Sequence, residues 1–168
     1  MLGPLAEGNQ QIADYLTNWV SGQNGRRQAG DDVDLQTLTA AVAALGQVGV
    51  GSAVDVLLES VLIQYPDFVT QAAENSIAAL IENPLEQAIS AVTGRETAGK
   101  LRAFEYFLSS DFLPEDQVPE LARVTLQDAL TAVPQEVVER EQIRQLRFLA
   151  AEVIRNAEYG DATREMIR

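Results

Sequence analysis

Asp55 and Glu59 are the residues whose types and spacing best suit a shared chemical task. They stand four residues apart in an apolar segment with helical spacing, so we expect both carboxylates one turn apart on one helix face. Such a face attracts a basic partner. Composition excludes more demanding chemistry. Because the chain has no histidine and no cysteine, serine–histidine hydrolysis, thiol catalysis, disulfide scaffolds and the common zinc and haem sites are ruled out.

Three further carboxylates, Asp31, Asp32 and Asp34, have the composition of a calcium loop. An EF-hand loop that begins at Asp32 would place Thr37 where glycine is required and Ala43 where a bidentate glutamate is required. Loop solubility and helix capping therefore explain the three aspartates better. We predict no metal site in the chain.

Gly46, Gly49 and Gly51 have the composition of a phosphate-binding loop but not its spacing. No Gly-Lys-Ser/Thr follows them, and they match neither a Walker loop nor a dinucleotide fingerprint. We interpret them as a helix end at Gly46 followed by a tight turn. Since no carboxylate pair is singled out for catalysis either, the sequence predicts no enzyme and no bound cofactor.

Charge is distributed unevenly along a chain of 168 residues with a formal net charge of −13. Nine acidic residues lie between Gln28 and Glu86, and no basic residue follows Arg27 until Arg95. Residues 134–168 are nearly balanced, with six arginines and seven acids. This pattern predicts a negative surface over the first half, unsuited to nucleic acid and suited to a basic protein partner. For the charge run taken alone, solvation of an exposed exterior is the favoured interpretation, and a groove that selects a basic partner is the alternative.

Aromatic side chains form one cluster, Phe104, Tyr106, Phe107 and Phe112. Helical spacing directs Phe104 to the core and Tyr106 away from it. An exposed Tyr106, or Phe107, would be an anchor for a partner protein. The sequence nevertheless favours packing between repeats as the role of this cluster, with the exposed anchor as the alternative.

The elements that position these residues are helices, and no strand is predicted. Residues 21–34 form a polar, glycine-rich segment that predicts a flexible loop. Asp34 or Asp32 is expected to cap the next helix, and Asn83 with Pro84 another. The predicted helices span about residues 4–20, 35–45, 52–62, 67–80, 84–93, 97–109, 121–134 and 134–157.

The segment Leu35–Val54 contains 20 residues without a charge, which is long enough for a membrane span. Its glycines and polar residues, and the periodic spacing of its apolar residues, favour a buried helix, a loop and a second helix. The first residues have no basic region and no apolar run, so we expect no signal peptide and favour a cytoplasmic protein. An exported mature domain, with its signal peptide removed, is the alternative.

An internal repeat is visible when the sequence is shifted by 35 residues, which places Val42 on Ile77 and Leu45 on Leu80. Residues 38–49 followed by 52–58 have the pattern of a first helix, a short glycine turn and a second helix. In this the chain resembles the HEAT and armadillo-like helical repeats, and residues 73–92 are a weaker copy. The Asp-Arg pair that many HEAT units carry at the turn is absent from the first of these units.

The resemblance implies an all-α fold, an α-solenoid of antiparallel helix pairs with about three to four repeats. We predict one domain over residues 1–168, in which an N-terminal helix and flexible loop (1–34) precede the repeat units 35–66, 67–94, 95–133 and 134–168. An irregular helical bundle is the alternative architecture. In HEAT-like arrays the second helices usually line the concave face, so the resemblance places Asp55 and Glu59 there.

The function expected from these features is a non-catalytic protein–protein interaction or scaffold module that binds a partner through an acidic helical-repeat surface. Asp55, Glu59 and Tyr106 are the predicted partner-binding residues. A HEAT-like enzyme, such as a bilin lyase or a DNA-base glycosylase, is an alternative, although a glycosylase requires a basic face. A structural spacer within a longer chain is a second alternative. The sequence predicts neither the oligomeric state nor the partner.

Overall fold

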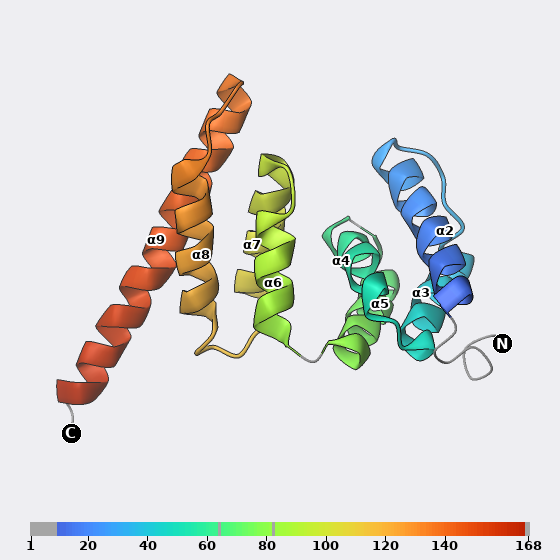
Figure 1. Cartoon of the computed structure of the whole chain (residues 1–168), viewed down its shortest axis with the longest axis horizontal. Helices are drawn as coiled ribbons and strands as arrows, with labels where there is room; N and C mark the ends of the chain where they lie inside the picture. Colours follow the sequence, from blue (N-terminus) through green and yellow to red (C-terminus); the bar gives the residue numbers. More distant parts are fainter. Residues whose placement is uncertain (1–9, 64, 82, 167–168) are drawn as a thin grey trace. The chain divides into compact units, whose positions relative to one another are not determined.

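The computed structural model describes residues 10–63, 65–81 and 83–166. Over these residues the chain is all-α, with eight α-helices, one short 3₁₀ helix and no strand (Figure 1). The predicted all-α class is confirmed. The chain divides into two compact units, Met1–Glu82 and Asn83–Arg168, which are described separately below. The boundary between them falls inside the predicted segment 67–94.

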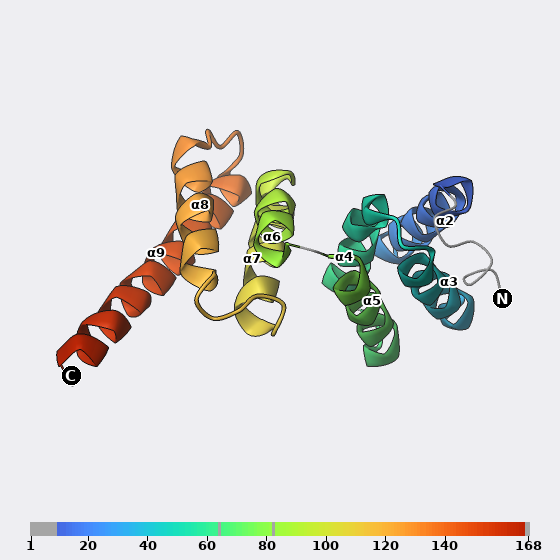
Figure 2. The ribbon, with the colours of Figure 1, turned by 60° about the horizontal axis from the view of Figure 1, so that its bottom comes forward.

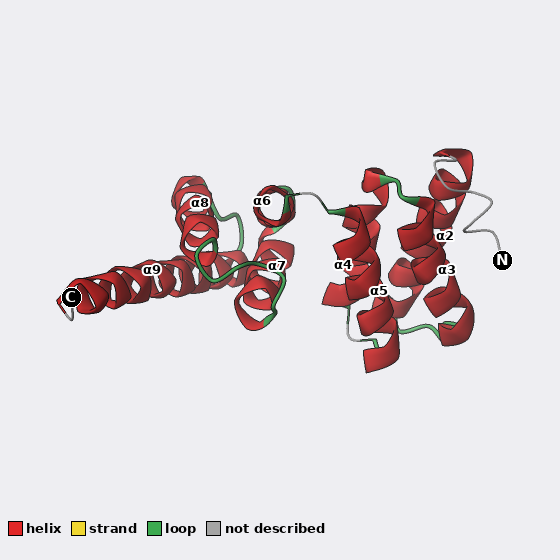
Figure 3. Ribbon diagram, turned by 90° about the horizontal axis from the view of Figure 1, so that it is seen from below, coloured by secondary structure: helices red, strands yellow, loops and turns green. Residues whose placement is uncertain are grey.

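In the described residues of the first unit, four α-helices lie in two layers (Figure 3). They are α2 (Gln10–Gln28), α3 (Leu35–Val48), α4 (Val54–Leu62) and α5 (Asp67–Leu80), with the 3₁₀ helix η1 (Gly51–Ala53) before α4. Helix α2 packs against α3 and α4, and α5 packs against the same two helices. The core that they enclose is aliphatic, and its fully buried side chains include Val20, Leu38, Val42, Leu45, Leu57 and Ile77.

Helix α2 is longer than the sequence predicts, because the expected loop over residues 21–34 is helical as far as Gln28. The prediction of a flexible loop directly after Val20 is therefore wrong. Asn24 explains the difference: its side chain is buried and donates hydrogen bonds to the Val56 carbonyl (3.3 Å) and the Ser60 hydroxyl (2.9 Å). Tyr65 donates a further bond to the Asn24 side-chain oxygen. These contacts with α4 and the residues after it favour a helix despite the glycines.

The start of α3 agrees with the prediction, since Asp34 is its N-cap. One carboxylate oxygen accepts hydrogen bonds from the backbone N–H groups of Gln36 (3.1 Å) and Thr37 (3.2 Å), and the other accepts from the Thr37 hydroxyl. These bonds, the Thr37 hydroxyl first, lower the pKa of Asp34 below its ordinary value.

The end of α3 differs from the prediction, because Gly46 lies inside the helix and Gly49 ends it, in a left-handed conformation with φ 76°. Gly46 instead faces α5. A Cβ atom at Gly46 would lie 2.7–2.9 Å from the Cα, Cβ and Oγ atoms of Ser76, whose hydroxyl donates to the Val42 carbonyl (3.0 Å). The glycine therefore permits the close approach of α3 and α5, a requirement set by tertiary packing.

The second unit contains α6 (Pro84–Thr93), α7 (Thr97–Ser109), α8 (Val118–Thr131) and α9 (Val137–Met166). Helix α7 has the predicted bounds, and Asn83 caps α6 as expected, with its side chain accepting from the Glu86 N–H (3.4 Å). Helix α9 is longer than predicted and extends well beyond the segment that packs against α8 (Figure 2). Helix α6 packs against α7 and α8, and α9 packs against the same two helices.

The core of the second unit is partly aromatic, with Phe104 and Phe107 fully buried beside Leu121 and Leu146. Glu139 connects its last helix to α7. One carboxylate oxygen accepts from the Gln135 backbone N–H (2.7 Å) and the other from the Thr97 hydroxyl (3.0 Å). These two bonds, the backbone bond first, hold the pKa of Glu139 below its ordinary value.

The uncharged segment Leu35–Val54 forms α3, the turn after it, η1 and the first residue of α4. Within the described ranges, no helix combines the length and the apolar character that crossing a membrane requires.

Candidate functional site

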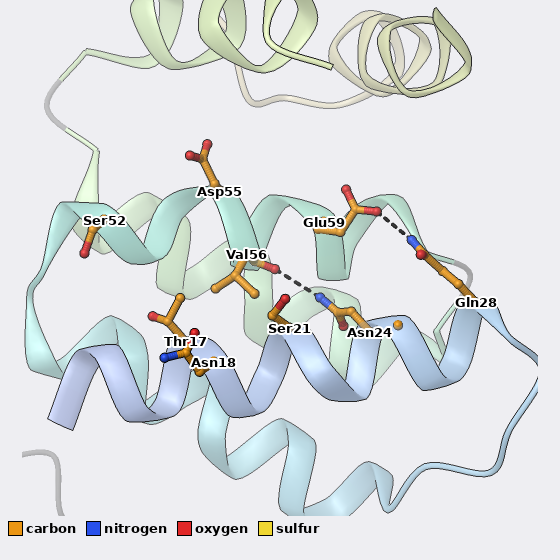
Figure 4. Close-up of a pocket in the computed structure, with 10 residues that line it drawn as sticks. Thr17, Asn18, Ser21, Asn24, Gln28, Ser52, Asp55, Val56 and Glu59 are labelled. Atoms are coloured by element: carbon orange, nitrogen blue, oxygen red, sulfur yellow. Dashed lines mark hydrogen bonds between the residues drawn. The ribbon is translucent and has the colours of Figure 1, made fainter. Parts of the chain in front are cut away.

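A groove of about 430 Å³ lies between α2 and the η1–α4 segment of the first unit (Figure 4). We call it the α2–α4 groove. It is lined by Thr17, Asn18, Ser21, Asn24, Gly25, Gln28, Ser52, Asp55, Val56 and Glu59. The two charged residues in this lining are Asp55 and Glu59, both predicted from the sequence. The α4 side of the groove is therefore negatively charged, and the α2 side carries uncharged amides and hydroxyls.

The direction of these two carboxylates follows from the pattern of α4. The buried residues of α4 are Val54, Val56, Leu57, Leu58, Ser60 and Val61, so Asp55 and Glu59 lie on the narrow strip of the helix that is not buried. Asp55 is exposed and Glu59 is half-buried, and both lie on the same side of α4 (Figure 4). One turn of helix brings the two carboxylates within reach of a single cationic group.

Two sets of hydrogen bonds hold the walls of the α2–α4 groove together. The Gln28 amide donates to Glu59 Oε1 at 2.7 Å and links the end of α2 to α4. Deeper in the groove, Asn24 connects α2 to the Val56 carbonyl and the Ser60 hydroxyl. Because Asn24 and Val56 are buried, this contact is shielded from water. The groove is thus built on two helices with a fixed spacing.

The α2 wall is the part of the site that the sequence reasoning missed. Ser21, Asn24 and Gln28 lie in the segment that was predicted to be a loop. A signal for the longer helix is present, since Ala13, Leu16, Val20 and Asn24 recur at intervals of three or four residues and all four are buried. A polar asparagine at the last of these positions interrupts the apolar pattern, which conceals the continuation of the helix.

Tyr106, the third predicted partner-binding residue, lies on α7 in the second unit and does not line the groove. Its ring is half-buried and stands edge-on to Phe107, with centroids 5.3 Å apart, and to Phe112, with centroids 6.3 Å apart. Phe107 is 1% exposed, so it is a core side chain and the alternative in which it is an exposed anchor is wrong. Tyr106 covers this aromatic cluster.

The carboxylates at 31, 32 and 34 divide between two roles. Asp34 caps α3, whereas Asp31 and Asp32 are exposed in the connection before it. In the part of the chain that the structure describes, no three side chains of the histidine, cysteine, aspartate or glutamate type are arranged to hold a metal ion.

Comparison of the chain with protein families, curated proteins and solved structures finds no match. The similarity to HEAT and armadillo-like repeats therefore stays a prediction based on the sequence pattern.

Proposed function

We propose that this chain is a non-catalytic interaction module, built from helical repeats, that binds a basic segment of another protein in the α2–α4 groove. The observation that carries the proposal is the pair of carboxylates, Asp55 and Glu59, on one wall of a preformed groove. Among the described residues that line the groove, the charged ones are the two acids of α4. A cationic side chain that enters the groove therefore meets two negative charges.

The repeat architecture is supported by the way the helices pair within each unit. In the first unit α2 pairs with α3 and α4 with α5, and the pairs meet through α2–α4 and α3–α5. In the second unit α6 pairs with α7 and α8 with α9, and the pairs meet through α6–α8 and α7–α9. Stacked helical hairpins have these nearest-neighbour contacts. These contacts favour hairpins that begin one helix earlier than the repeat units 35–66, 67–94 and 95–133 predicted from the sequence.

Arginine is the partner side chain that suits the groove best. A guanidinium group presents donors in a planar fork and forms charge-assisted bonds with carboxylates. The amides and hydroxyls of Asn18, Ser21 and Gln28 offer acceptors and donors on the opposite wall. Contacts of this kind give specificity and a fast association rate rather than high affinity.

The location of binding is tested by titrating the isotopically labelled full chain with a hexa-arginine peptide and following its amide resonances by NMR. We expect the largest shifts at residues 17–28 and 52–59, with the resonances of the second unit unchanged. A hexa-glutamate peptide is the matched control and should shift none of them. Shifts spread over all acidic segments alike would overturn the proposal, because they would indicate non-specific attraction to the net charge.

A further inference from the structure

Helix α9 has an outer face that points away from its own unit. Its inner face buries Ile143, Leu146 and Ala150. On one flank Arg147 donates to the Ala129 carbonyl of α8 (2.8 and 3.0 Å), and on the other flank Gln145 donates to Glu105 of α7 (3.1 Å). The face between these flanks, opposite the core, carries Val137, Glu141, Arg144, Phe148, Glu152 and Arg155, spaced three or four residues apart.

This outer face, which we call the Phe148 face, combines two exposed apolar side chains with four charges. Phe148 is 65% exposed and Val137 is 78% exposed. The charged side chains form pairs within the helix, Arg144 with Glu141 (2.6 Å) and Arg155 with Glu152 (3.5 Å). An exposed aromatic ring with charged side chains before and after it along the helix is typical of a small protein interface.

The charges on the Phe148 face are arranged with opposite signs on either side of Phe148. Arg144 lies four residues before it and Glu152 four residues after it. Glu141 lies seven residues before it and Arg155 seven residues after it. If two copies of the helix meet antiparallel about a twofold axis at Phe148, every arginine therefore faces a glutamate of the other copy. In a parallel pair, each charge would face its own kind.

We infer that the Phe148 face binds a second copy of this chain, with the two α9 helices antiparallel and the two Phe148 rings in contact at the twofold axis. The charge pattern identifies the occupant, because a surface that is complementary to itself under a twofold rotation is what an isologous dimer requires. Each copy supplies Arg144 to the partner's Glu152 and Glu141 to the partner's Arg155. The pairs within each helix then join the pairs between helices in one network.

The dimer is weak, because one helix face from each copy forms an interface at the small end of the known range. We expect a dissociation constant on the order of tens of micromolar. The Phe148 face belongs to α9 of the second unit and the α2–α4 groove to the first unit, so the inference does not depend on the proposed function.

Sedimentation equilibrium of the full chain, at concentrations up to about 200 µM to cover that range, tests the inference. We expect a monomer–dimer equilibrium that Phe148→Glu abolishes, because two glutamates would then meet at the twofold axis. Phe68→Glu is the matched control: Phe68 is another exposed phenylalanine, 52% exposed on α5 in the first unit. It should leave the equilibrium unchanged. Circular dichroism confirms that both variants fold.

Charge exchange tests the antiparallel register itself. In a dimer of the Arg144→Glu variant, the new glutamate of each copy faces the partner's Glu152. In a dimer of the Glu152→Arg variant, the new arginine of each copy faces the partner's Arg144. Each variant should dimerise about tenfold more weakly than the parent. A mixture of the two variants should form heterodimers with the parent affinity, because each arginine again faces a glutamate. A monomeric parent chain, or a dimer that is insensitive to these changes, would overturn the inference and leave the face to a different partner.

Discussion

The two units of the molecule share one pattern of helix pairing and fill it differently. The first has an aliphatic core that is fastened by buried polar contacts, such as Asn24 with Ser60 and Ser76 with the Val42 carbonyl. The second has buried rings, Phe104 and Phe107, in its core. The same arrangement of four helices thus tolerates two kinds of interior, provided that each helix presents one apolar face.

The surfaces of the two units differ as well. Residues 1–82 contain two basic side chains, Arg26 and Arg27, and neither is among the residues that line the α2–α4 groove. The second unit mixes both signs in ion pairs, among them Lys100 with Asp128 and Arg144 with Glu141. One unit is suited to a basic partner and the other to a partner that carries both charges. We assign different binding roles to the two units on this basis.

The largest expected effect comes from Phe107→Ala, which removes a fully buried ring from the second unit. We expect a loss of about 3–5 kcal/mol in the free energy of unfolding of that unit. Trp19, the only tryptophan, lies on α2 and reports on the first unit. The midpoint of urea unfolding should therefore fall when unfolding is followed by far-UV circular dichroism. The midpoint followed by Trp19 fluorescence should stay unchanged. An equal shift in both signals would mean that the two units unfold together and that their cores do not contribute to stability independently.

Gly46→Ala is expected to have a smaller effect on stability, and this effect should fall on the first unit instead of the second. The new Cβ would meet the Cα atom of Ser76, so α3 and α5 must separate, at a cost of about 1–3 kcal/mol. Trp19 fluorescence should report this loss. Gly25→Ala is the matched control, since that glycine lies in α2 with no atom within 4 Å of the new Cβ, and it should raise stability by up to about 1 kcal/mol. Equal effects of the two substitutions would contradict the close approach.

The smallest effects are those of pH. Folding lowers the pKa of Asp34 in the first unit and of Glu139 in the second, from ordinary values of 3.8 and 4.5. Each carboxylate therefore stabilises its unit above the ordinary value, and this contribution is lost as the pH falls through the folded-state pKa. Glu139→Gln should lower the stability of the second unit at neutral pH and converge with the parent in acid.

Asp34→Asn should show the same convergence in Trp19 fluorescence, as the pH falls through the lowered folded-state pKa of Asp34. The asparagine keeps an oxygen that accepts the capping bonds, so the comparison isolates the charge. A difference from the parent that persisted unchanged at low pH would show that the charge of the carboxylate contributes nothing.

Features decided by neighbouring residues could be predicted from the sequence. Asp34 and Asn83 were identified as caps because a cap bonds to N–H groups two or three residues away. Helix α7 was predicted with its bounds for a similar reason, since its apolar spacing and its flanks are local. The α4 wall of the groove belongs to this class, because Asp55 and Glu59 need only one helix to stand together.

Features decided by distant residues could not be predicted. Gly46 was expected to end a helix, but Ser76, in another helix, determines its role. The segment after Val20 was expected to be a loop, but the bond between Asn24 and Ser60, 36 residues away, keeps it helical. The α2 wall of the groove was missed for a related reason: its helical spacing continues to Asn24, but a polar residue at that position is explained only by its tertiary contact with Ser60.

The most direct test of the proposed function is the affinity of the full chain for a hexa-arginine peptide, measured by isothermal titration calorimetry at low salt. The variant Asp55→Lys/Glu59→Lys reverses both groove charges, and Asp31→Lys/Asp67→Lys reverses two exposed charges outside the groove. Both change the net charge equally. We predict that the groove variant loses about tenfold or more in affinity and the control about twofold or less. Equal losses in the two variants would contradict the assignment of the α2–α4 groove as the binding site.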